Sequence, residues 1–139
     1  MTIDSRASKI IADFDFFNSW EEKYEHLIDL GKDMSELKEG LKTESNLIKG
    51  CQSKVWMHCE YKNKKLYFYA DSDALITKGL VALIIKLYSG LSAEEILNGN
   101  TDFFKQIGLR EQLSMTRSNG LNMMLEKIRK YGQKYVKNG

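Results

Sequence analysis

The sequence predicts one domain in which helices accompany a small antiparallel sheet of about three strands. The chain has 139 residues, of which 42% are hydrophobic, enough for one real core but too few for two. Apolar residues recur at helical spacing towards both ends of the chain, whereas in its middle they alternate with polar ones. No repeat, low-complexity tract or proline-rich linker divides the sequence. We therefore expect residues 1–139 to form a single domain.

The first 40 residues predict two helices. Apolar residues at helical spacing mark them: Ile10, Ile11, Phe14 and Phe17 in the first, and Trp20, Tyr24, Leu27, Ile28 and Leu30 in the second. Ser19 and Glu22 have the spacing of a capping box, which predicts that the second helix begins there. Gly31 offers an end to that helix.

The middle of the chain predicts a β-hairpin. Its alternating apolar residues are Val55, Met57, Cys59 and Tyr61 in one run and Leu66, Phe68 and Ala70 in the other. The polar segment from Lys62 to Lys65 joins the two runs. Leu47 and Ile48 predict a short third strand, so the sheet is expected to be small and antiparallel.

The remainder of the chain predicts four helices. The first is capped by Ser72 and carries the apolar stripe Leu75, Ile76, Leu80, Leu83, Ile84 and Leu87 before Gly90. A second capping box, Ser92 with Glu95, opens a short helix that reaches Leu97. Phe103, Phe104 and Ile107 mark another before Gly108. The last helix is expected to begin between residues 116 and 119, to continue through Tyr131 and to end in a basic, frayed tail.

Charge and hydropathy exclude several classes of protein. Twenty-one Lys and Arg against 19 Asp and Glu give a net charge of +2, which lacks the excess that a dedicated nucleic-acid binder uses. No apolar run approaches the roughly 20 residues of a membrane span, and the amino terminus is unlike a signal peptide. Isolated glycines do not form a nucleotide-binding loop. We expect a cytoplasmic protein whose two cysteines are reduced and too few for a disulfide framework.

Cys51 is the candidate reactive residue. It follows Gly50 on a predicted turn just before the first strand, where a sulfur is accessible. Lys49 and Lys54 flank it, and nearby positive charge is expected to lower the pKa of a thiol and favour its nucleophilic thiolate. The alternative is a buried cysteine that acts only as a small hydrophobic residue. No Cys, His and Asn arrangement for classical nucleophilic catalysis can be assigned, although His58 is a possible neighbour.

A metal site is a rival use for the thiols. Zinc and iron-sulfur clusters normally take three or four Cys or His ligands, and this sequence has two of each. His26 lies in a predicted helix, and His58 lies on the strand face opposite Cys59, so convergence of all four is not expected. Cys59 shares its strand face with core residues. A metal-binding or scaffold module that uses Cys51 and Cys59 with outside ligands therefore stays open as the alternative function.

Two further polar groups are candidates for the site. Asp71 and Asp73 resemble paired carboxylates, but they flank Ser72 at a helix start, where acidic residues favourably meet the helix dipole. Arg117 precedes the last helix, which Ser118 or Asn119 can cap. Arg117 is then either a surface charge or a guanidinium that faces the Cys51 loop and favours a thiolate or persulfide anion.

Four motifs occur together, in a fixed order, along almost the whole chain. They are Trp20-Glu21-Glu22-Lys23-Tyr24 with Ile28-Asp29-Leu30-Gly31, Gly50-Cys51-Gln52-Ser53 with Val55-Trp56, Ala70-Asp71-Ser72-Asp73-Ala74 with Lys78-Gly79-Leu80, and Arg117-Ser118-Asn119-Gly120-Leu121. This set resembles the SufE family of cysteine-desulfuration proteins. The resemblance implies a compact α+β domain whose small antiparallel sheet is packed by helices, similar to the iron-sulfur scaffold (IscU-like) fold.

The resemblance also implies a function. Family members accept persulfide sulfur from a pyridoxal-phosphate cysteine desulfurase (SufS-like or CsdA-like), stimulate that enzyme, and pass the sulfur to an iron-sulfur scaffold complex (SufBCD-like). Cys51 matches the acceptor cysteine, and Arg117 and Asp73 match polar positions near it, which implies that Arg117 stabilises the thiolate or persulfide and that Asp73 supports the loop or site. The pyridoxal phosphate belongs to the partner, so no cofactor is expected on this chain, which is an acceptor and activator and not a stand-alone enzyme.

Departures from the family pattern are modest. Because the chain contains no proline, Ala93 and Met115 stand where family sequences often carry one. Lys54 stands where a neutral amide is common, and its charge is expected to deepen the thiolate bias of Cys51. None of these departures removes the acceptor thiol.

Overall fold

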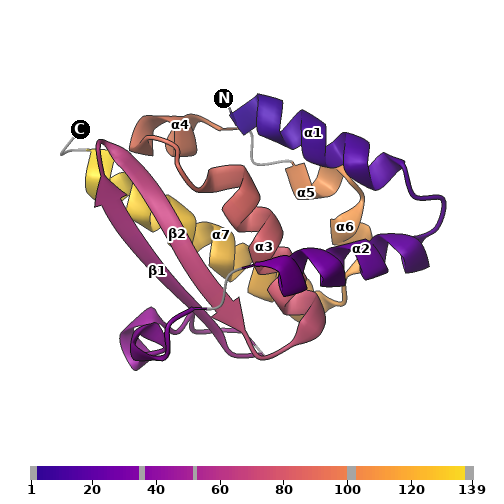
Figure 1. Ribbon diagram of the computed structural model, residues 1–139, viewed down its shortest axis with the longest axis horizontal. Helices are drawn as coiled ribbons and strands as arrows, with labels where there is room; N and C mark the ends of the chain where they lie inside the picture. The colour runs from indigo at the N-terminus through magenta and orange to yellow at the C-terminus, as the bar shows by residue number, and fades with distance from the viewer. Residues whose placement is uncertain (1–2, 35–36, 52, 100–102, 137–139) are drawn as a thin grey trace.

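A single apolar helix, α3 (Leu75–Tyr88), lies at the centre of the fold. Figure 1 shows the computed structural model, which describes residues 3–34, 37–51, 53–99 and 103–136. The hairpin and helix α7 lie to one side of α3, and helices α1 and α2 lie to the other. The other elements are α1 (Ile3–Asp15), α2 (Trp20–Asp33), β1 (Val55–Lys62), β2 (Lys65–Ser72), α4 (Ala93–Asn98), α5 (Phe103–Gln106), α6 (Leu109–Gln112) and α7 (Met115–Val136). Short 3-10 turns, Glu39–Leu41 and Glu44–Asn46, precede the sheet.

The sheet is the predicted hairpin, but it has two strands instead of about three. Strands β1 and β2 pair antiparallel from Val55 opposite Ser72 to Lys62 opposite Lys65. Asn63 and Lys64 form the turn between them with φ angles of 54° and 64°, the conformation that matches the twist of a tight hairpin. The predicted third strand is reduced to one antiparallel bridge between Leu47 and Trp56. The 3-10 turn that ends at Asn46 leaves too little extended chain for a longer pairing.

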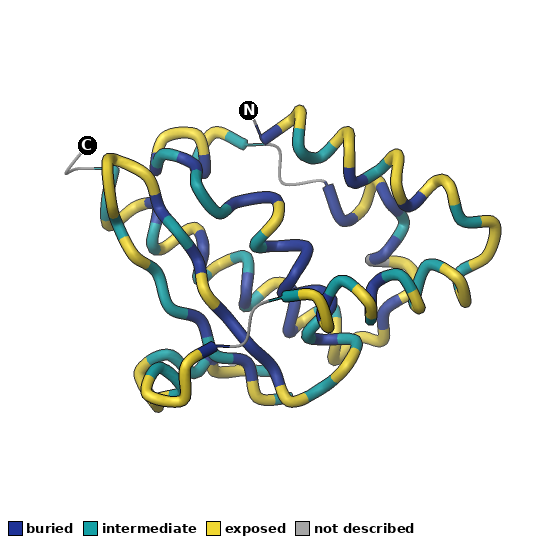
Figure 2. Tube along the Cα trace, viewed as in Figure 1, coloured by how far each residue is buried: buried dark blue, intermediate teal, exposed yellow. Residues whose placement is uncertain are grey.

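The hydrophobic core is built around α3, which is apolar on most of its surface. Figure 2 shows that α3 is dark blue along much of its length, whereas α1 and α2 expose their outer faces. Side chains from every α-helix and from both strands contribute to one buried cluster. A helix that is apolar on most of its surface requires neighbours on most sides, which is why the other helices and the hairpin pack around α3.

Helices α2 and α3 approach each other closely at two glycines. A Cβ atom placed on Gly31 would lie 2.9 Å from the Gly79 nitrogen, and one placed on Gly79 would overlap the carbonyl oxygen of Leu27. The prediction that Gly31 ends α2 is therefore wrong: Gly31 is buried inside the helix, which continues to Asp33. Its lack of a side chain serves interhelical contact, a property that a single sequence does not distinguish from helix termination.

The helix starts agree with the sequence in part. Ser19 caps α2, and Ser92 forms a complete capping box with Glu95 at the start of α4. Ser72, in contrast, is the last residue of β2, and Ala74 is the N-cap of α3 without a side-chain bond. Helix α7 begins at Met115, earlier than predicted, because the Ser114 hydroxyl accepts the Arg117 amide at 3.2 Å. Helix α6 has no counterpart among the predicted helices, and the predicted frayed tail lies partly outside the described residues.

Candidate functional site

Cys51 lies on the loop that connects the second 3-10 turn to β1. Gly50, with φ of +90°, turns the chain immediately before it, a backbone conformation that glycine adopts without steric cost. The loop runs past α7, and the Cys51 sulfur lies 3.7 Å from the carbonyl oxygen of Gly120. A Cβ atom placed on Gly120 would lie 3.6 Å from this sulfur, an ordinary van der Waals distance, so the thiol packs directly against the helix. Gln52, part of the same motif, lies outside the described residues.

The Cys51 thiol is half-buried and protonated in this conformation. Burial raises the pKa of Cys51 above its ordinary value, because a thiolate loses hydration when it leaves water. A thiol that donates to the Gly120 carbonyl also has to keep its proton. The prediction that flanking lysines lower this pKa is therefore wrong for this conformation. Lys49 instead pairs with Glu44 at 2.9 Å.

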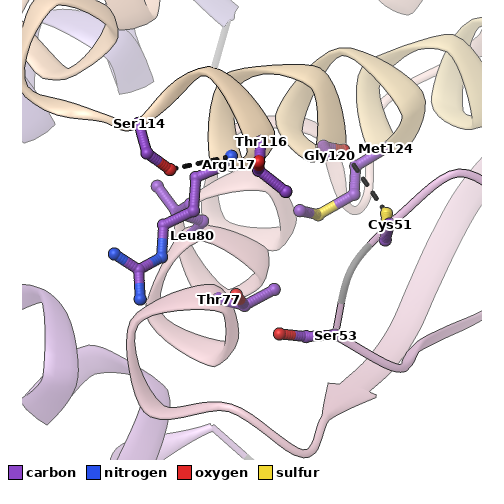
Figure 3. A pocket seen from close by; sticks show the side chains of 9 residues that line it. All are labelled: Cys51, Ser53, Thr77, Leu80, Ser114, Thr116, Arg117, Gly120 and Met124. Atoms are coloured by element: carbon purple, nitrogen blue, oxygen red, sulfur yellow. Dashed lines mark hydrogen bonds between the residues drawn. The ribbon is translucent and has the colours of Figure 1, made fainter.

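A cavity of about 230 Å³ adjoins the Cys51 sulfur. It lies between the Cys51 loop, the start of α3 and the first turns of α7 (Figure 3). Four of its nine lining residues carry hydroxyl groups, two have apolar side chains and one supplies a guanidinium. The residues that line it are Cys51, Ser53, Thr77, Leu80, Ser114, Thr116, Arg117, Gly120 and Met124.

Arg117 lines the same cavity as Cys51 but does not contact the sulfur. Figure 3 shows its guanidinium at the opposite side of the cavity from the thiol. The pKa of Cys51 is raised by burial, with no lowering by a neighbouring charge. The fold thus brings the two predicted residues to one site, while a direct stabilisation of the thiolate by Arg117 requires a different conformation.

Asp73 holds the far end of the Cys51 loop. Its carboxylate oxygen accepts the backbone N–H of Lys54 at 3.0 Å, and its own backbone N–H donates to the Lys54 carbonyl at 3.3 Å. These two bonds clasp the loop where it enters β1. Neither Asp73 nor Ser72 caps α3, because the N-cap is Ala74 and the Asp73 carboxylate bonds across to the loop.

Asp71 anchors the elements that surround the loop. Its carboxylate lies 3.4 Å from the Lys42 ammonium and 3.3 Å from that of Lys78, and it accepts the Ser72 amide at 2.8 Å. Burial favours its neutral form, but the Ser72 amide and the two lysines outweigh burial and lower the pKa of Asp71. Lys42 also lies over the Trp56 ring, 5.5 Å from its centroid. One buried carboxylate thus joins the 3-10 segment, β2 and α3.

Cys59 and the histidines lie apart from this cavity. Cys59 is half-buried on β1, where burial raises its pKa to about 12 despite the opposing effect of Lys134. His58 pairs weakly with Glu60 at 3.7 Å, and His26 packs against Phe14 and Phe17. In the part of the chain that the structure describes, no three Cys, His, Asp or Glu side chains are grouped so that they could hold a metal ion.

Sequence reasoning missed three of the hydroxyl residues in the cavity wall. Thr77 falls among the apolar residues of α3, and Ser114 and Thr116 lie next to the motif that contains Arg117. The signal for Thr77 is a polar residue near the start of a mostly apolar helix. Only the packing of α3 against α7 gives that position a meaning.

The raised thiol pKa values predict the pH dependence of alkylation. For the protein alone, the rate of Cys51 modification by iodoacetamide should rise continuously from pH 7 to above pH 9, because the thiolate fraction grows throughout that range. Cys59, with a pKa of about 12, should react more slowly at pH 9. Peptide mass spectrometry of timed samples measures both rates. A plateau of the Cys51 rate near neutral pH would show a low-pKa thiol and contradict the prediction.

The clasp at Asp73 predicts how the loop responds to mutation. Asp73→Ala removes the acceptor for the Lys54 amide, so the loop should open more often and Cys51 alkylation at pH 8 should become about fivefold faster, as expected for the loss of one hydrogen bond of about 1 kcal/mol. Asp29→Ala, at an exposed position on α2, is the matched control. Equal alkylation rates in the two variants would mean that Asp73 does not restrain the loop.

Comparison of the sequence with known proteins shows the family of this chain. Residues 8–132 match the family model described as SufE, Fe-S metabolism associated domain. The chain belongs to the SufE family. A SufE-like protein from Rhizobium etli is 44% identical over 126 residues, with 87% of this chain and 85% of that protein covered. The cysteine desulfuration protein SufE of Wigglesworthia glossinidia brevipalpis is 39% identical over 122 residues, with 86% and 85% covered.

The same fold is also found in a solved structure. The solution structure of a hypothetical protein from Thermus thermophilus superposes with a TM-score of 0.79 at 19% identity, covering 95% of this chain and 96% of that one. This match supports the predicted α+β class, whereas the likeness to the iron-sulfur scaffold fold stays a prediction. None of the helices within the described residues combines the length and hydropathy that crossing a membrane requires.

Proposed function

We propose that this SufE-family protein accepts sulfur on Cys51 from the persulfide of a cysteine desulfurase and delivers it to an iron-sulfur assembly scaffold. The observation that carries the proposal is the position of Cys51, half-buried on a loop beside a polar cavity, within a chain of this family. The name of the relative from Wigglesworthia glossinidia brevipalpis, a cysteine desulfuration protein, supports the same reaction.

The transfer is a thiol-persulfide exchange that requires no external oxidant. The Cys51 thiolate attacks the outer sulfur of the partner's cysteine persulfide. A bond forms between Cys51 Sγ and that sulfur, the partner's sulfur-sulfur bond breaks, and the partner's thiolate leaves. The proton that Cys51 loses is available to the leaving thiolate, so atoms and charge balance. The pyridoxal phosphate that releases sulfur from free cysteine belongs to the partner.

Docking has to change the environment of Cys51 before this step. The thiol in the free protein is protonated and turned towards Gly120. This half-buried position would protect a loaded persulfide from reductants, but the protonated thiol is a poor nucleophile. A partner that draws the loop outwards breaks the contact with Gly120 and exposes the sulfur. In that open state the charge of Lys54 would favour the thiolate, whereas Arg117 would have to turn towards the loop to favour the thiolate or the persulfide anion.

The proposal includes partners and a compartment. The donor is a SufS-like or CsdA-like desulfurase, and the acceptor is a SufBCD-like scaffold complex. Both cysteines are free thiols in the structure, and free thiols persist in the reducing cytoplasm, where we place the reaction.

Desulfurase turnover and loop exposure test the proposal. Adding the protein to a cysteine desulfurase should increase the rate of alanine formation, because the acceptor removes the sulfur that blocks the next turnover, while the protein alone should form none. A desulfurase whose catalytic cysteine is replaced by alanine should still dock and should accelerate iodoacetamide modification of Cys51. Unchanged alanine formation and an unchanged Cys51 rate would together refute the proposal.

A further inference from the structure

The cavity beside Cys51 contains a polar group that the proposed transfer between proteins does not use. Thr77 is 7% exposed, and its side chain extends from α3 into the cavity (Figure 3). Within the described residues, no side-chain oxygen is both fully buried and without a partner, so the Thr77 hydroxyl is open to the cavity. A hydroxyl that faces a cavity in this way can donate a hydrogen bond to a ligand or water that enters it, or accept one.

The cavity also contains an uncompensated positive charge. Among the described residues that line it, Arg117 carries the only formal charge, and its guanidinium forms no ion pair with the described part of the chain. The amino terminus of α7, which begins at Met115, adds the positive end of a helix dipole nearby. A guanidinium and a helix amino terminus together favour a carboxylate or another small anion.

The shape of the cavity restricts the ligand further. Its volume of about 230 Å³ exceeds the share of one water several times but is below that of drug-sized sites. Figure 3 shows the Cys51 sulfur and the Arg117 guanidinium at opposite sides, with the apolar Leu80 and Met124 in the wall between them. A suitable ligand therefore has an anionic group at one end, a short aliphatic chain, and a group that reacts with sulfur at the other end.

We propose that this cavity is a binding subsite for a small carboxylate-bearing thiol, which takes the outer sulfur from the Cys51 persulfide. The carboxylate binds Arg117, and Thr77 donates its hydroxyl proton to the ligand. This inference rests on the proposed function only in that Cys51 carries the sulfur. It adds an acceptor of low molecular mass to the protein acceptor.

The sulfur transfer to such a thiol balances without a further reactant. The ligand's thiolate attacks the outer sulfur of the Cys51 persulfide. A bond forms between these two sulfurs, and the bond between Cys51 Sγ and the outer sulfur breaks. Cys51 leaves as a thiolate and takes the proton that the ligand's thiol released. The product is a small persulfide that still carries its carboxylate.

The test uses persulfide that is loaded chemically, so that it does not depend on a desulfurase. The full chain with Cys59→Ser is treated with inorganic polysulfide, and intact mass spectrometry follows the loss of the sulfur adduct of about 32 Da from Cys51. The two probes are 3-mercaptopropionate and the neutral 3-mercaptopropanol. The rate should saturate with 3-mercaptopropionate and exceed the rate with the alcohol about tenfold at low concentration.

Two variants connect the effect to the proposed contacts. Thr77→Val and Arg117→Met should each raise the half-saturating concentration of 3-mercaptopropionate about tenfold, so that its advantage over 3-mercaptopropanol at low concentration is lost. Arg129→Met, at an exposed position on the same helix, is the matched control and should behave like the parent. Equal, linear concentration dependences for the two thiols, or unchanged kinetics in both variants, would overturn the proposal.

Binding is also measured on the unmodified protein, which keeps the inference testable if polysulfide does not load Cys51. NMR titration with 3-mercaptopropionate should shift the amide signals of Ser53, Thr77 and Thr116, and these shifts should be absent in Arg117→Met. No shifts at these residues in the parent would overturn the subsite. A subsite that binds and reacts in a protein that no desulfurase can load would refute the proposed function and leave this inference standing.

Discussion

Cys51→Ser should abolish sulfur loading completely. After incubation with a desulfurase and free cysteine, the parent protein should gain sulfur adducts of about 32 Da on intact mass spectrometry, and the variant should gain none, because a hydroxyl does not undergo exchange with a persulfide. Stimulation of alanine formation should be lost in the same variant. We therefore expect the substitution to remove the sulfur adduct completely.

Cys59→Ser is the matched control for this experiment. Cys59 is also half-buried, but it lies on β1 away from the cavity, and its pKa of about 12 makes it a poor nucleophile near neutral pH. This variant should load sulfur as the parent does. Retention of the adduct in Cys51→Ser together with its loss in Cys59→Ser would show that Cys59 is the acceptor and contradict our proposal.

Gly79→Ala should produce the largest loss of stability among conservative substitutions. The added Cβ would overlap the Leu27 carbonyl oxygen and lie 2.7 Å from Leu27 Cγ, so α2 and α3 must separate. Alanine gains about 1 kcal/mol of helix propensity over glycine, but overpacking against a backbone atom outweighs that gain. We expect a net loss of about 3 kcal/mol in the free energy of unfolding, measured by urea denaturation.

Gly40→Ala separates packing from the general effect of replacing glycine. Nothing lies within 4 Å of a Cβ atom at Gly40, and its φ is not in the left-handed region. Its free energy of unfolding should therefore stay within about 0.5 kcal/mol of the parent value. Similar unfolding free energies for Gly79→Ala and Gly40→Ala would show that the contact between α2 and α3 adjusts without cost.

The local features of this protein were predictable because they depend on residues close in sequence. The hairpin follows from alternating residues on either side of a polar turn, and Ser19 and Ser92 cap their helices through residues three positions away. Gly31 and Ser72 differ from their predicted roles, because each has a role set by a distant or tertiary contact. Gly31 packs against Gly79 of another helix, and Ser72 ends a strand instead of starting a helix.

The candidate site shows the same division. The motif around Cys51 determined which residue is the candidate acceptor, and it did so without any knowledge of its surroundings. The fold decided the charge state of that thiol. The neighbouring lysines predict a lowered pKa, but Cys51 is buried against Gly120, 69 residues further along the chain, and this burial raises the pKa of the thiol.

The sequence alone determined the family, the hairpin and the candidate acceptor cysteine. Only the tertiary structure decided the protonation of Cys51, the clasp at Asp73 and the cavity shared with Thr77 and Arg117, because burial and through-space contacts depend on segments that a local pattern does not bring together.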